Sequence, residues 1–398
     1  MKTLLQINVT ANSGSTGKIA EQIGKCAAEN GFRSVIAYGR KSLPSESELI
    51  PVGSRKDYLW HGVESRLLDN HGHASRTATK KLLKQIDSLK PDIIHLHNIH
   101  GYYLNYPLLF SYLAGRNIPV VWTLHDCWSF TGHCAHFDYA RCKKWQSGCR
   151  ECPQLKSYPK SFFRDRSKQN YCDKKHYFTL PEKMYIVPVS NWLSEITKQS
   201  FLGKYPVKTI HNGIEIDVFS PSDTSEIRKK YSLGDKKILL GVASVWEKRK
   251  GLPDFIELSK KLSDDYLIVL IGSGIEKLKT LPANILTVPR TESTKELAQF
   301  YSLADVLLNP TWEDTYPTVN LESVACGTPV ITYQTGGSPE SITDDTGIVV
   351  KRGDVDALHL AISRVTKQQS VCRQYAVEHF DRNKCFQKYV DLYKEILA

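Results

Sequence analysis

Short apolar runs recur along the whole chain and alternate with amphipathic segments of helical length. In the first half the runs are LLQINV, SVIAYG, DIIHLHN, PVVWTLH, MYIVPVS and VKTIHNG, and in the second half they are ILLGVAS, YLIVLIGSG, NILTVP, DVLLNP, PVITYQTGG and GIVVK. Each run is typical of a strand in a buried parallel sheet. Segments such as TGKIAEQIGKCAAENG and STKELAQFYSLA, the second with a Ser-x-x-Glu start, have the length and ends of helices. The pattern predicts two doubly wound α/β domains with Rossmann-like parallel sheets.

The boundary between these domains is expected at a polar, turn-rich stretch in the middle of the chain. The chain has 398 residues, which is more than one hydrophobic core usually serves. We therefore expect an N-terminal domain over residues 1–215, with a Cys-rich insertion at 127–172, and a C-terminal domain over 216–380. The amphipathic tail, residues 381–398, is expected to form a helix that can pack on either domain, including back on the first.

Positive charge is concentrated in the first half. Residues 1–215 contain 30 Lys and Arg against 17 Asp and Glu, whereas the remaining residues contain 23 against 25. The asymmetry suggests an anionic partner such as a membrane surface, a phosphorylated lipid or nucleic acid, and a solvated basic face is the alternative. The N-terminus turns polar too soon for a signal peptide, and no run of about 18 apolar residues exists. We expect a cytoplasmic protein that contacts the inner face of the cell membrane.

Ligands of open α/β sheets bind beyond the carboxyl ends of the strands, so the residues that follow each run are the candidates for chemistry. In the first domain these are a glycine-rich turn with Gly14 and Gly17, and His125 with Asp126 at the end of an apolar run. The glycines can bring helix amides to an anion, although simple turn geometry also explains them. His125 can bind a sugar or phosphate, or serve as a buried structural histidine.

In the second domain two loops favour anions and a third carries acids. Arg249 and Lys250 lie between a strand and a helix, where cations and helix amides suit a diphosphate. Gly336 and Gly337 precede another helix start and offer backbone amides. The stretch EDTYPTVNLES places Asp314 in a loop and Glu322 on the helix behind it, where carboxylates can accept hydrogen bonds from sugar and ribose hydroxyls. The alternative is that Glu322 has only a structural role and stabilises the N-terminus of this helix.

Together, EDTYPTVNLESVACGTPVI, EKRKG, TGGSPE, TIHNGIEIDVF and NSGSTGKIA resemble retaining glycosyltransferases of family 4. The resemblance implies the GT-B fold, in which two Rossmann-like domains face a central crevice. It also implies roles for individual residues of the second domain. Lys250 with Arg249 clamps the donor diphosphate, the amides of Thr318, Val319 and Asn320 face the phosphates, Glu322 binds the ribose, and Asp314 takes the place of the first family acid. In the first domain the resemblance implies that His125 approaches the donor sugar and that Gly14 to Gly17 lie under the diphosphate.

The chain departs from the family pattern in two places. DTYPTV replaces the common EGFGLP, and Ser244 stands where many relatives have an arginine. The resemblance implies neither an enzyme nucleophile nor a catalytic metal. Asp354 and Asp356 form the one Asp-x-Asp of the sequence, and helix capping explains them better than magnesium.

Six cysteines fall in one region, and four of them have the spacing C-x7-C-x6-C-x2-C. These are Cys134, Cys142, Cys149 and Cys152. Four thiolates could form a closed structural zinc site that pins the insertion. Free thiols and a disulfide are the alternatives, and a reduced cytoplasmic setting argues against the disulfide.

These observations lead to an expected function. We expect transfer of a sugar, with retention, from a nucleotide-diphosphate sugar to a glycan or a polyprenyl-diphosphate-linked saccharide in surface polysaccharide synthesis. Family frequency favours a UDP-sugar as the donor. A phosphorylase or nucleotide-sugar epimerase on the same fold is the main alternative. A zinc-stabilised nucleic-acid-binding protein is a weaker one, because basic and aromatic residues interleave after the cysteines, and we expect no nucleic-acid partner.

Overall fold

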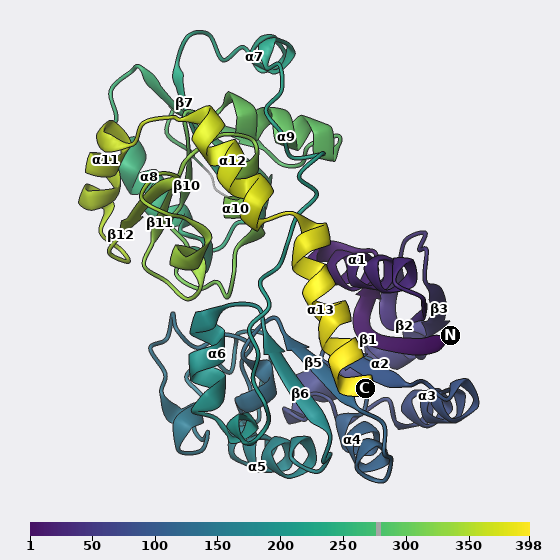
Figure 1. The fold of residues 1–398 in the computed structure, drawn as a ribbon. Helices are drawn as coiled ribbons and strands as arrows, with labels where there is room; N and C mark the ends of the chain where they lie inside the picture. Colours follow the sequence, from purple (N-terminus) through teal and green to yellow (C-terminus); the bar gives the residue numbers. More distant parts are fainter. Residues whose placement is uncertain (276–279) are drawn as a thin grey trace. The chain divides into compact units, whose positions relative to one another are not determined.

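A computed structural model describes residues 1–275 and 280–398 (Figure 1). The chain divides into two compact units, each described here by itself. Unit 1 comprises Met1–His211 and Phe386–Ala398, and unit 2 comprises Asn212–Cys385. Each unit contains a six-stranded sheet within the described residues, and all pairings between neighbouring strands of the two sheets are parallel. The doubly wound fold class predicted from the apolar runs is confirmed.

The sheet of unit 1 has the strand order β3-β2-β1-β4-β5-β6. Its strands are β1 (Lys2–Ala11), β2 (Phe32–Ser42), β3 (Glu48–Pro51), β4 (Ile93–Leu96), β5 (Val120–Leu124) and β6 (Met184–Pro188). The helices are α1 (Gly14–Glu29), α2 (Arg55–Leu68), α3 (Arg76–Leu89), α4 (Tyr106–Ala114), α5 (Ser167–Phe178) and α6 (Asn191–Lys198). The first strand is central, so the chain winds outward on both sides of it.

The sheet of unit 2 repeats this plan with the order β12-β11-β10-β7-β8-β9. Its strands are β7 (Lys237–Val245), β8 (Tyr266–Ser273), β9 (Ile285–Val288), β10 (Val306–Asn309), β11 (Val330–Tyr333) and β12 (Gly347–Val350). The helices are α7 (Ser225–Lys230), α8 (Leu252–Ser259), α9 (Thr294–Leu303), α10 (Thr318–Ala325), α11 (Val355–Arg364) and α12 (Gln369–His379). The core packs Leu239, Leu270 and Ile331 of the sheet against helix residues such as Phe255 and Leu358.

One predicted strand is wrong. The run VKTIHNG does not join the sheet of unit 1, and Val207 forms only an isolated bridge with Ile186 of β6. Lys208 and Ile210 still donate backbone hydrogen bonds to Ile186 and Pro188. The Pro206 carbonyl also accepts from the Ile186 N–H, but Pro188, the last residue of β6, has no N–H to donate to the Lys208 carbonyl, so the ladder cannot continue along the run. Conversely, the short edge strand β3 has no apolar run long enough to reveal it.

The C-terminal helix α13 (Arg382–Leu397) packs on the sheet of unit 1 through buried Phe386, Tyr389 and Tyr393 (Figure 1). The Tyr393 hydroxyl lies 2.6 Å from Nδ1 of His95 on β4. The other ring nitrogen of His95 lies 2.7 Å from Thr123 Oγ1 on β5, and Thr123 donates to the Tyr389 hydroxyl. Residues from opposite ends of the chain therefore share one buried hydrogen-bond network.

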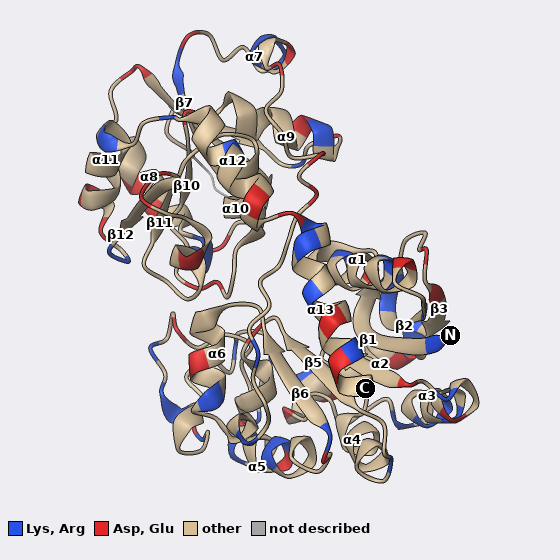
Figure 2. Ribbon diagram, in the orientation of Figure 1, with Lys and Arg blue, Asp and Glu red and all other residues tan. Residues whose placement is uncertain are grey.

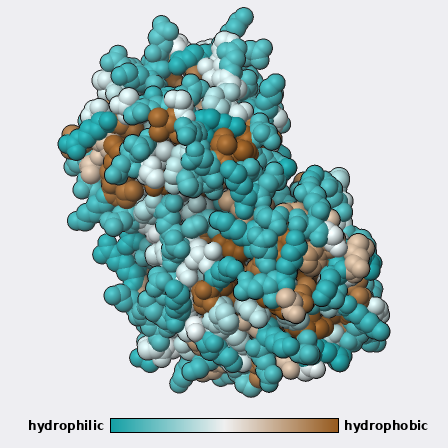
Figure 3. Space-filling model, in the orientation of Figure 1, coloured by the Kyte–Doolittle hydropathy of each residue, from teal (hydrophilic) through white to brown (hydrophobic). Residues whose placement is uncertain are grey.

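Charged residues occur on helices of both units in the view of Figure 2. Figure 2 shows Lys and Arg recurring along helices of unit 1 such as α3 and α5. The face drawn in Figure 3 is mostly hydrophilic, with separate hydrophobic patches. Among the described residues, no helix has the length and apolar character needed to cross a membrane.

The network between α13 and the sheet generates a stability prediction. Tyr393→Ala should cost about 3 to 5 kcal/mol of folding free energy, because it empties a fully buried aromatic site. Tyr393→Phe keeps the ring and removes only the hydroxyl that meets His95, so it should cost about 1 to 3 kcal/mol. Urea unfolding followed by circular dichroism measures both. Equal losses for the two variants would contradict the packing role of the ring.

Candidate functional site

The loops after β7 and β10 meet in unit 2, where these two strands are neighbours although they are far apart in sequence. Nζ of Lys250, in the loop after β7, lies 2.6 Å from Oδ2 of Asp314, in the loop after β10. Both side chains are partly exposed. Arg249 lies beside Glu247, at 3.5 Å. The candidate cations are therefore already next to carboxylates in this structure.

The same two loops are joined through their backbones. The N–H of Trp312 donates to the carbonyl of Arg249 at 2.8 Å, and the Thr311 hydroxyl also points to that carbonyl, at 3.3 Å. Gly251 has a φ of 78°, and a Cβ there would come within 2.2 Å of the Pro310 carbonyl oxygen. Both the positive φ and the short distance to Pro310 require glycine at this position. The close approach of the two loops positions Lys250, the residue before Gly251.

The loop after β11 packs against Asp314 from the other side. Gly336 has a φ of 53°, and a Cβ there would lie 1.8 Å from the Asp314 carbonyl oxygen. The N–H of Gly337 donates to the same carbonyl at 3.3 Å. One of the two glycine amides predicted for anion binding is thus used inside the protein, and both glycines position the Asp314 loop.

Helix α10 begins at Thr318 beside these loops, with Thr318 and Val319 partly exposed. Asn320 differs from them because its side chain is fully buried. Its amide donates to Ser338 and Ser341 and accepts from Asn309. The Asn320 side chain therefore ties the start of α10 to β10 and to the loop after β11.

Glu322, one turn along α10, accepts a 2.8 Å hydrogen bond from the Tyr301 hydroxyl of α9. Burial raises the pKa of Tyr301 well above its usual value, and the nearby Glu322 carboxylate raises it further. The phenol therefore stays protonated and remains a donor. Glu322 itself is only partly buried, so its carboxylate is oriented from one side.

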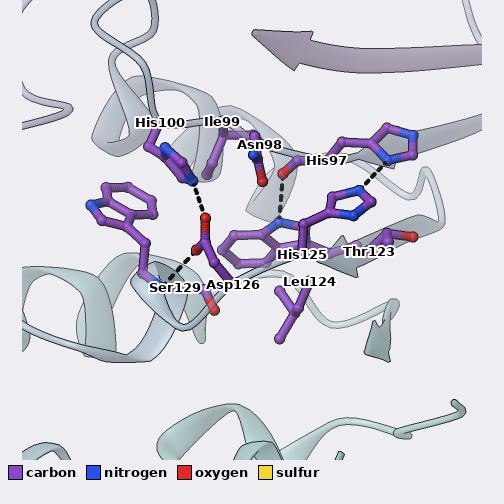
Figure 4. A pocket seen from close by; sticks show the side chains of 11 residues that line it. His97, Asn98, Ile99, His100, Thr123, Leu124, His125, Asp126 and Ser129 are labelled. Atoms are coloured by element: carbon purple, nitrogen blue, oxygen red, sulfur yellow. Dashed lines mark hydrogen bonds and ion pairs between the residues drawn. The ribbon is translucent and has the colours of Figure 1, made fainter. Parts of the chain in front are cut away.

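In unit 1 a small pocket lies where the loops after β4 and β5 come together, and Figure 4 shows the side chains that line it. Nδ1 of His97 lies 3.2 Å from Nε2 of His125, and the two rings are stacked. His97 Nε2 is 2.9 Å from the side-chain oxygen Oε1 of Gln6, and the side-chain nitrogen Nε2 of Gln6 donates to the backbone carbonyl of Ala20.

This chain of hydrogen bonds assigns the protons on both histidines. Because the Gln6 amide donates to Ala20, its oxygen must accept from His97 Nε2, and His97 Nδ1 then accepts from His125 Nε2. Burial lowers the pKa of His125 to about 4, with the nearby Asp126 opposing the shift. His125 is therefore neutral near pH 7, with the proton on Nε2 and Nδ1 as the acceptor nitrogen.

Asp126 faces the same pocket and is held in a fixed orientation (Figure 4). Oδ2 of Asp126 lies 2.8 Å from His100 Nε2, and Oδ1 accepts from the N–H of Trp128. Burial opposes ionisation of this carboxyl, but the charge and hydrogen bond of His100 outweigh it and lower the pKa of Asp126 to about 2. On the other side, Nδ1 of His100 lies 2.9 Å from the Tyr158 hydroxyl. The pocket thus holds an ionised carboxylate beside a neutral histidine.

The glycine-rich turn of unit 1 starts α1 as the sequence indicates. Gly14 has a φ of 68°, and the N–H of Asn12 donates to the Gly17 carbonyl. A Cβ at Gly17 would lie 2.5 Å from Thr10 Oγ1. Gly17 is therefore fixed by packing, while nothing lies within 4 Å of a Cβ at Gly14. The packing favours the turn-geometry interpretation for Gly17.

The four spaced cysteines line one cavity, but the structure gives no support to the zinc prediction. Among the residues described, no group of three or more His, Cys, Asp or Glu side chains is arranged to hold a metal ion. Cys134 and Cys152 instead share a hydrogen bond, which lowers the pKa of Cys152 and raises that of Cys134, and Cys149 accepts from the Gly132 N–H. All ten cysteines are free, so the disulfide alternative is not seen either.

The structure groups the predicted residues by unit. In unit 2 it brings Lys250, Asp314, Gly336 and the start of α10 together at neighbouring strand ends. In unit 1 it joins His125 to His97, and Asp126 to His100. Sequence reasoning assigned no role to Tyr301. For His97 and His100 it favoured a structural role, because the alternation in HLHNIHG is also typical of a strand edge.

Known proteins match the chain over both units. Residues 17–218 match the family described as Glycosyltransferase Family 4, and residues 223–379 match the one described as Glycosyl transferases group 1. The chain belongs to Glycosyltransferase Family 4 and is a glycosyltransferase of the GT-B fold.

One curated relative and two solved structures are similar to the chain over nearly its whole length. The putative colanic acid biosynthesis glycosyl transferase WcaC of Escherichia coli K12 is 23% identical, over 99% of this chain and 100% of that protein. A glycosyltransferase structure from Rickettsia africae has a TM-score of 0.70 at 18% identity, covering 100% of this chain and 99% of that one. The structure of Anabaena Alr3699/HepE in complex with UDP has a TM-score of 0.68 at 14% identity, covering 99% and 100%. These two structures support the fold.

The buried histidines of unit 1 generate a prediction about pH. Burial lowers the pKa of His61 to about 3 and those of His73 and His125 to about 4, whereas an unfolded histidine titrates near 6.5. The unfolded chain therefore binds protons first, so the stability these histidines contribute is complete above about pH 6.5 and is lost as the pH falls toward 4. Asp126 adds a loss between about pH 4 and 2.

Unit 1 should accordingly lose more stability than unit 2 as the pH falls from 7 to 5. Unit 2 carries only His359 and His379, and neither is buried. Hydrogen exchange at the two pH values, corrected for the intrinsic rate, measures each unit separately. A larger loss of stability in unit 2 than in unit 1 between pH 7 and pH 5, or a unit 1 that is more stable at pH 5 than at pH 7, would contradict the sign of the effect.

Proposed function

We propose that the protein transfers a sugar, with retention at the anomeric carbon, from a nucleotide-diphosphate sugar to a glycan or a polyprenyl-diphosphate-linked saccharide. Surface polysaccharide synthesis is the proposed setting, because the relative WcaC matches the chain over its whole length. A UDP-sugar is the favoured donor. Structures of Anabaena Alr3699/HepE, which has the same fold, are described as complexes with UDP and with UDP-glucose.

The observation that carries the proposal is the meeting of three loops at the strand ends of unit 2. They place Lys250 2.6 Å from Asp314, in the loop that leads into the first turn of α10. A cation and the amides of a helix start together suit a diphosphate, although the Asn320 N–H here already donates to the Pro317 carbonyl at 3.2 Å. In this proposal Lys250 and Arg249 bind the diphosphate with the amides of Thr318, Val319 and Asn320, while Glu322 binds the ribose diol.

The remaining predicted residues take matching places in the proposal. Asp314 accepts hydrogen bonds from the donor sugar, and Gly336 and Gly337 hold its loop in place. In unit 1 the neutral His125 accepts a hydrogen bond from a sugar hydroxyl through Nδ1, and Gly14 leaves space for a phosphate near the start of α1. These assignments have a common logic, since each group is charged or oriented before the ligand arrives.

The proposed reaction needs no enzyme nucleophile. The bond between the anomeric carbon and the diphosphate oxygen breaks, and the acceptor oxygen bonds to the same face of that carbon. The acceptor proton passes to the departing phosphate oxygen. Lys250, Arg249 and the amides of α10 stabilise the charge that grows on the diphosphate. No metal enters this scheme, and zinc has no part in it.

A donor panel tests the activity. Nucleotide sugars with different bases should be screened for thermal stabilisation, and the donor found should release free nucleotide only when a saccharide acceptor is added. Nuclear magnetic resonance of the product then reports the anomeric configuration. Nucleotide release without an acceptor, or conversion of the donor sugar alone, would favour the phosphorylase or epimerase alternative, and stabilisation by oligonucleotides would favour a nucleic-acid binder.

Glu322 provides a test of the donor site. Glu322→Ala should lower turnover by about 100-fold, a typical cost of losing one charged contact to a reacting ligand. Tyr301→Phe is the matched control, because it keeps the carboxylate and removes only the hydroxyl that orients it, so its loss should be smaller. Steady-state kinetics with the donor varied measures both. Full activity of a folded Glu322→Ala protein would refute the assignment.

The ion pair of Lys250 and Asp314 provides a second test. Lys250→Ala should weaken UDP binding much more than uridine binding, because only UDP carries the diphosphate. Asp314→Asn should increase the affinity for UDP by about threefold to tenfold, because Lys250 then has no ion pair to break before it binds the diphosphate. In a Lys250→Ala background the same substitution should give no increase. Titration calorimetry of the two single variants and the double variant measures the coupling. Equal weakening of UDP and uridine would indicate a structural role for Lys250.

A further inference from the structure

Helix α2 of unit 1 turns its apolar side outward. Its buried residues are His61, Gly62 and Ser65, which are polar or small. Leu59, Trp60, Val63 and Leu67 are between 44% and 67% exposed. A surface helix normally buries its apolar stripe and exposes its polar face, so α2 is inverted, and its apolar stripe is available to a partner.

A second apolar element lies beside the end of α2. Phe162 and Phe163 are 54% and 78% exposed, and their rings lie 6.3 Å apart. The N–H of Phe162 donates to the carbonyl of Arg66 on α2 at 2.8 Å. The neighbouring Ser161 is fully buried and its hydroxyl donates to the Arg164 carbonyl. The two phenylalanines therefore extend the apolar stripe of α2 from an anchored turn.

The charges around these side chains are predominantly positive. Arg55 and Lys56 are exposed on the first turn of α2, and Lys160 and Arg164 are exposed on either side of the two phenylalanines. The acidic residues nearby each accept a hydrogen bond from a neighbouring group, although Asp165 is itself exposed. The Asp57 carboxylate accepts from Ser54, Glu64 accepts from Asn70, and Asp165 accepts from the backbone of Cys152 and Ser167.

We propose that α2 and the turn at residues 160–164 form a docking surface for an anionic lipid bilayer. Leu59, Trp60, Val63, Leu67, Phe162 and Phe163 enter the boundary between headgroups and acyl chains, and the four cations meet lipid phosphates. Exposed aromatic and aliphatic side chains ringed by Lys and Arg are what such an interface requires. A second copy of the chain fits less well, because a two-fold contact would bring the same cations face to face.

A series of contacts links this surface to the pocket of unit 1. The Arg66 guanidinium lies 5.4 Å from the centre of the Tyr102 ring, which packs against Tyr158. The Tyr158 hydroxyl contacts His100, the partner of Asp126. An acceptor carried in the bilayer would therefore arrive next to the pocket. This last step rests on the proposed function, whereas the docking surface itself does not.

Vesicle binding tests the proposal without any need for activity. The wild-type chain should sediment with phosphatidylglycerol-rich vesicles, more weakly at high salt and more weakly still with phosphatidylcholine alone. The double variant Trp60→Ser with Phe163→Ser should bind at least about tenfold more weakly, since two large apolar side chains no longer leave water. Lys160→Glu with Arg164→Glu should lose binding to the anionic vesicles in particular.

A matched control and two further readouts keep the outcomes distinct. Leu360→Ser removes an equally exposed leucine, 53% exposed on α11 of unit 2, and should bind vesicles like the wild type. All variants should keep the wild-type thermal shift with UDP, so a failure of UDP binding would refute the proposed function and leave the docking surface standing. Wild-type vesicle binding by the Trp60 and Phe163 variant would overturn the proposal, as would a wild-type dimer that this variant dissociates.

Discussion

The order of strands in each sheet is the constraint on which both candidate sites depend. β1 and β7 each begin a unit and lie in the middle of its sheet, with later strands added first on one side and then on the other. The loops that leave neighbouring central strands therefore turn to opposite faces and open a space between them. Lys250 and Asp314 meet at this point of unit 2, beyond β7 and β10. The histidine pocket of unit 1 lies one strand further along, beyond β4 and β5, on one side of the corresponding point between β1 and β4. Short backbone bonds and close glycine contacts, such as those at Gly251 and Gly336, then set distances within this space.

The two units prepare polar groups by different physical means. In unit 2 the cation is stabilised by a nearby carboxylate at a partly exposed position, which solvent screens and a ligand can disrupt. In unit 1 His97 and His125 are neutral because burial disfavours their charged form, and their orientations follow from a network that reaches back to Gln6 and Ala20. A site of the first kind responds to a charged ligand, and one of the second kind offers fixed hydrogen-bond acceptors.

Much of the fold could be predicted from the sequence, because buried parallel strands are nearly continuous apolar runs. The positions of Lys250, Asp314 and Glu322 after such runs were also accessible, since strand ends converge in this class of sheet. What the sequence could not provide was pairing across long separations. The hydrogen bond between Glu322 and Tyr301 and the hydrogen bond between Cys134 and Cys152 depend on side-chain geometry that spacing does not encode. The run VKTIHNG shows the converse limit, because apolar alternation alone does not establish a continuous ladder.

Helix α2 illustrates why an amphipathic pattern gives a stripe but not its direction. The spacing of Leu59, Val63 and Leu67 is the one that normally marks a core-facing side, and only the structure shows His61 and Ser65 taking that place. Burying His61 is tolerated because both its ring nitrogens find partners, Ser75 and the N–H of Gly72. The ring of His61 is thus satisfied inside the protein and has no need to face water, whereas the buried hydroxyl of Ser65 has no hydrogen-bond partner among the described residues. The apolar face is left outside at a cost in solvation, and a bilayer that covers it would recover that cost.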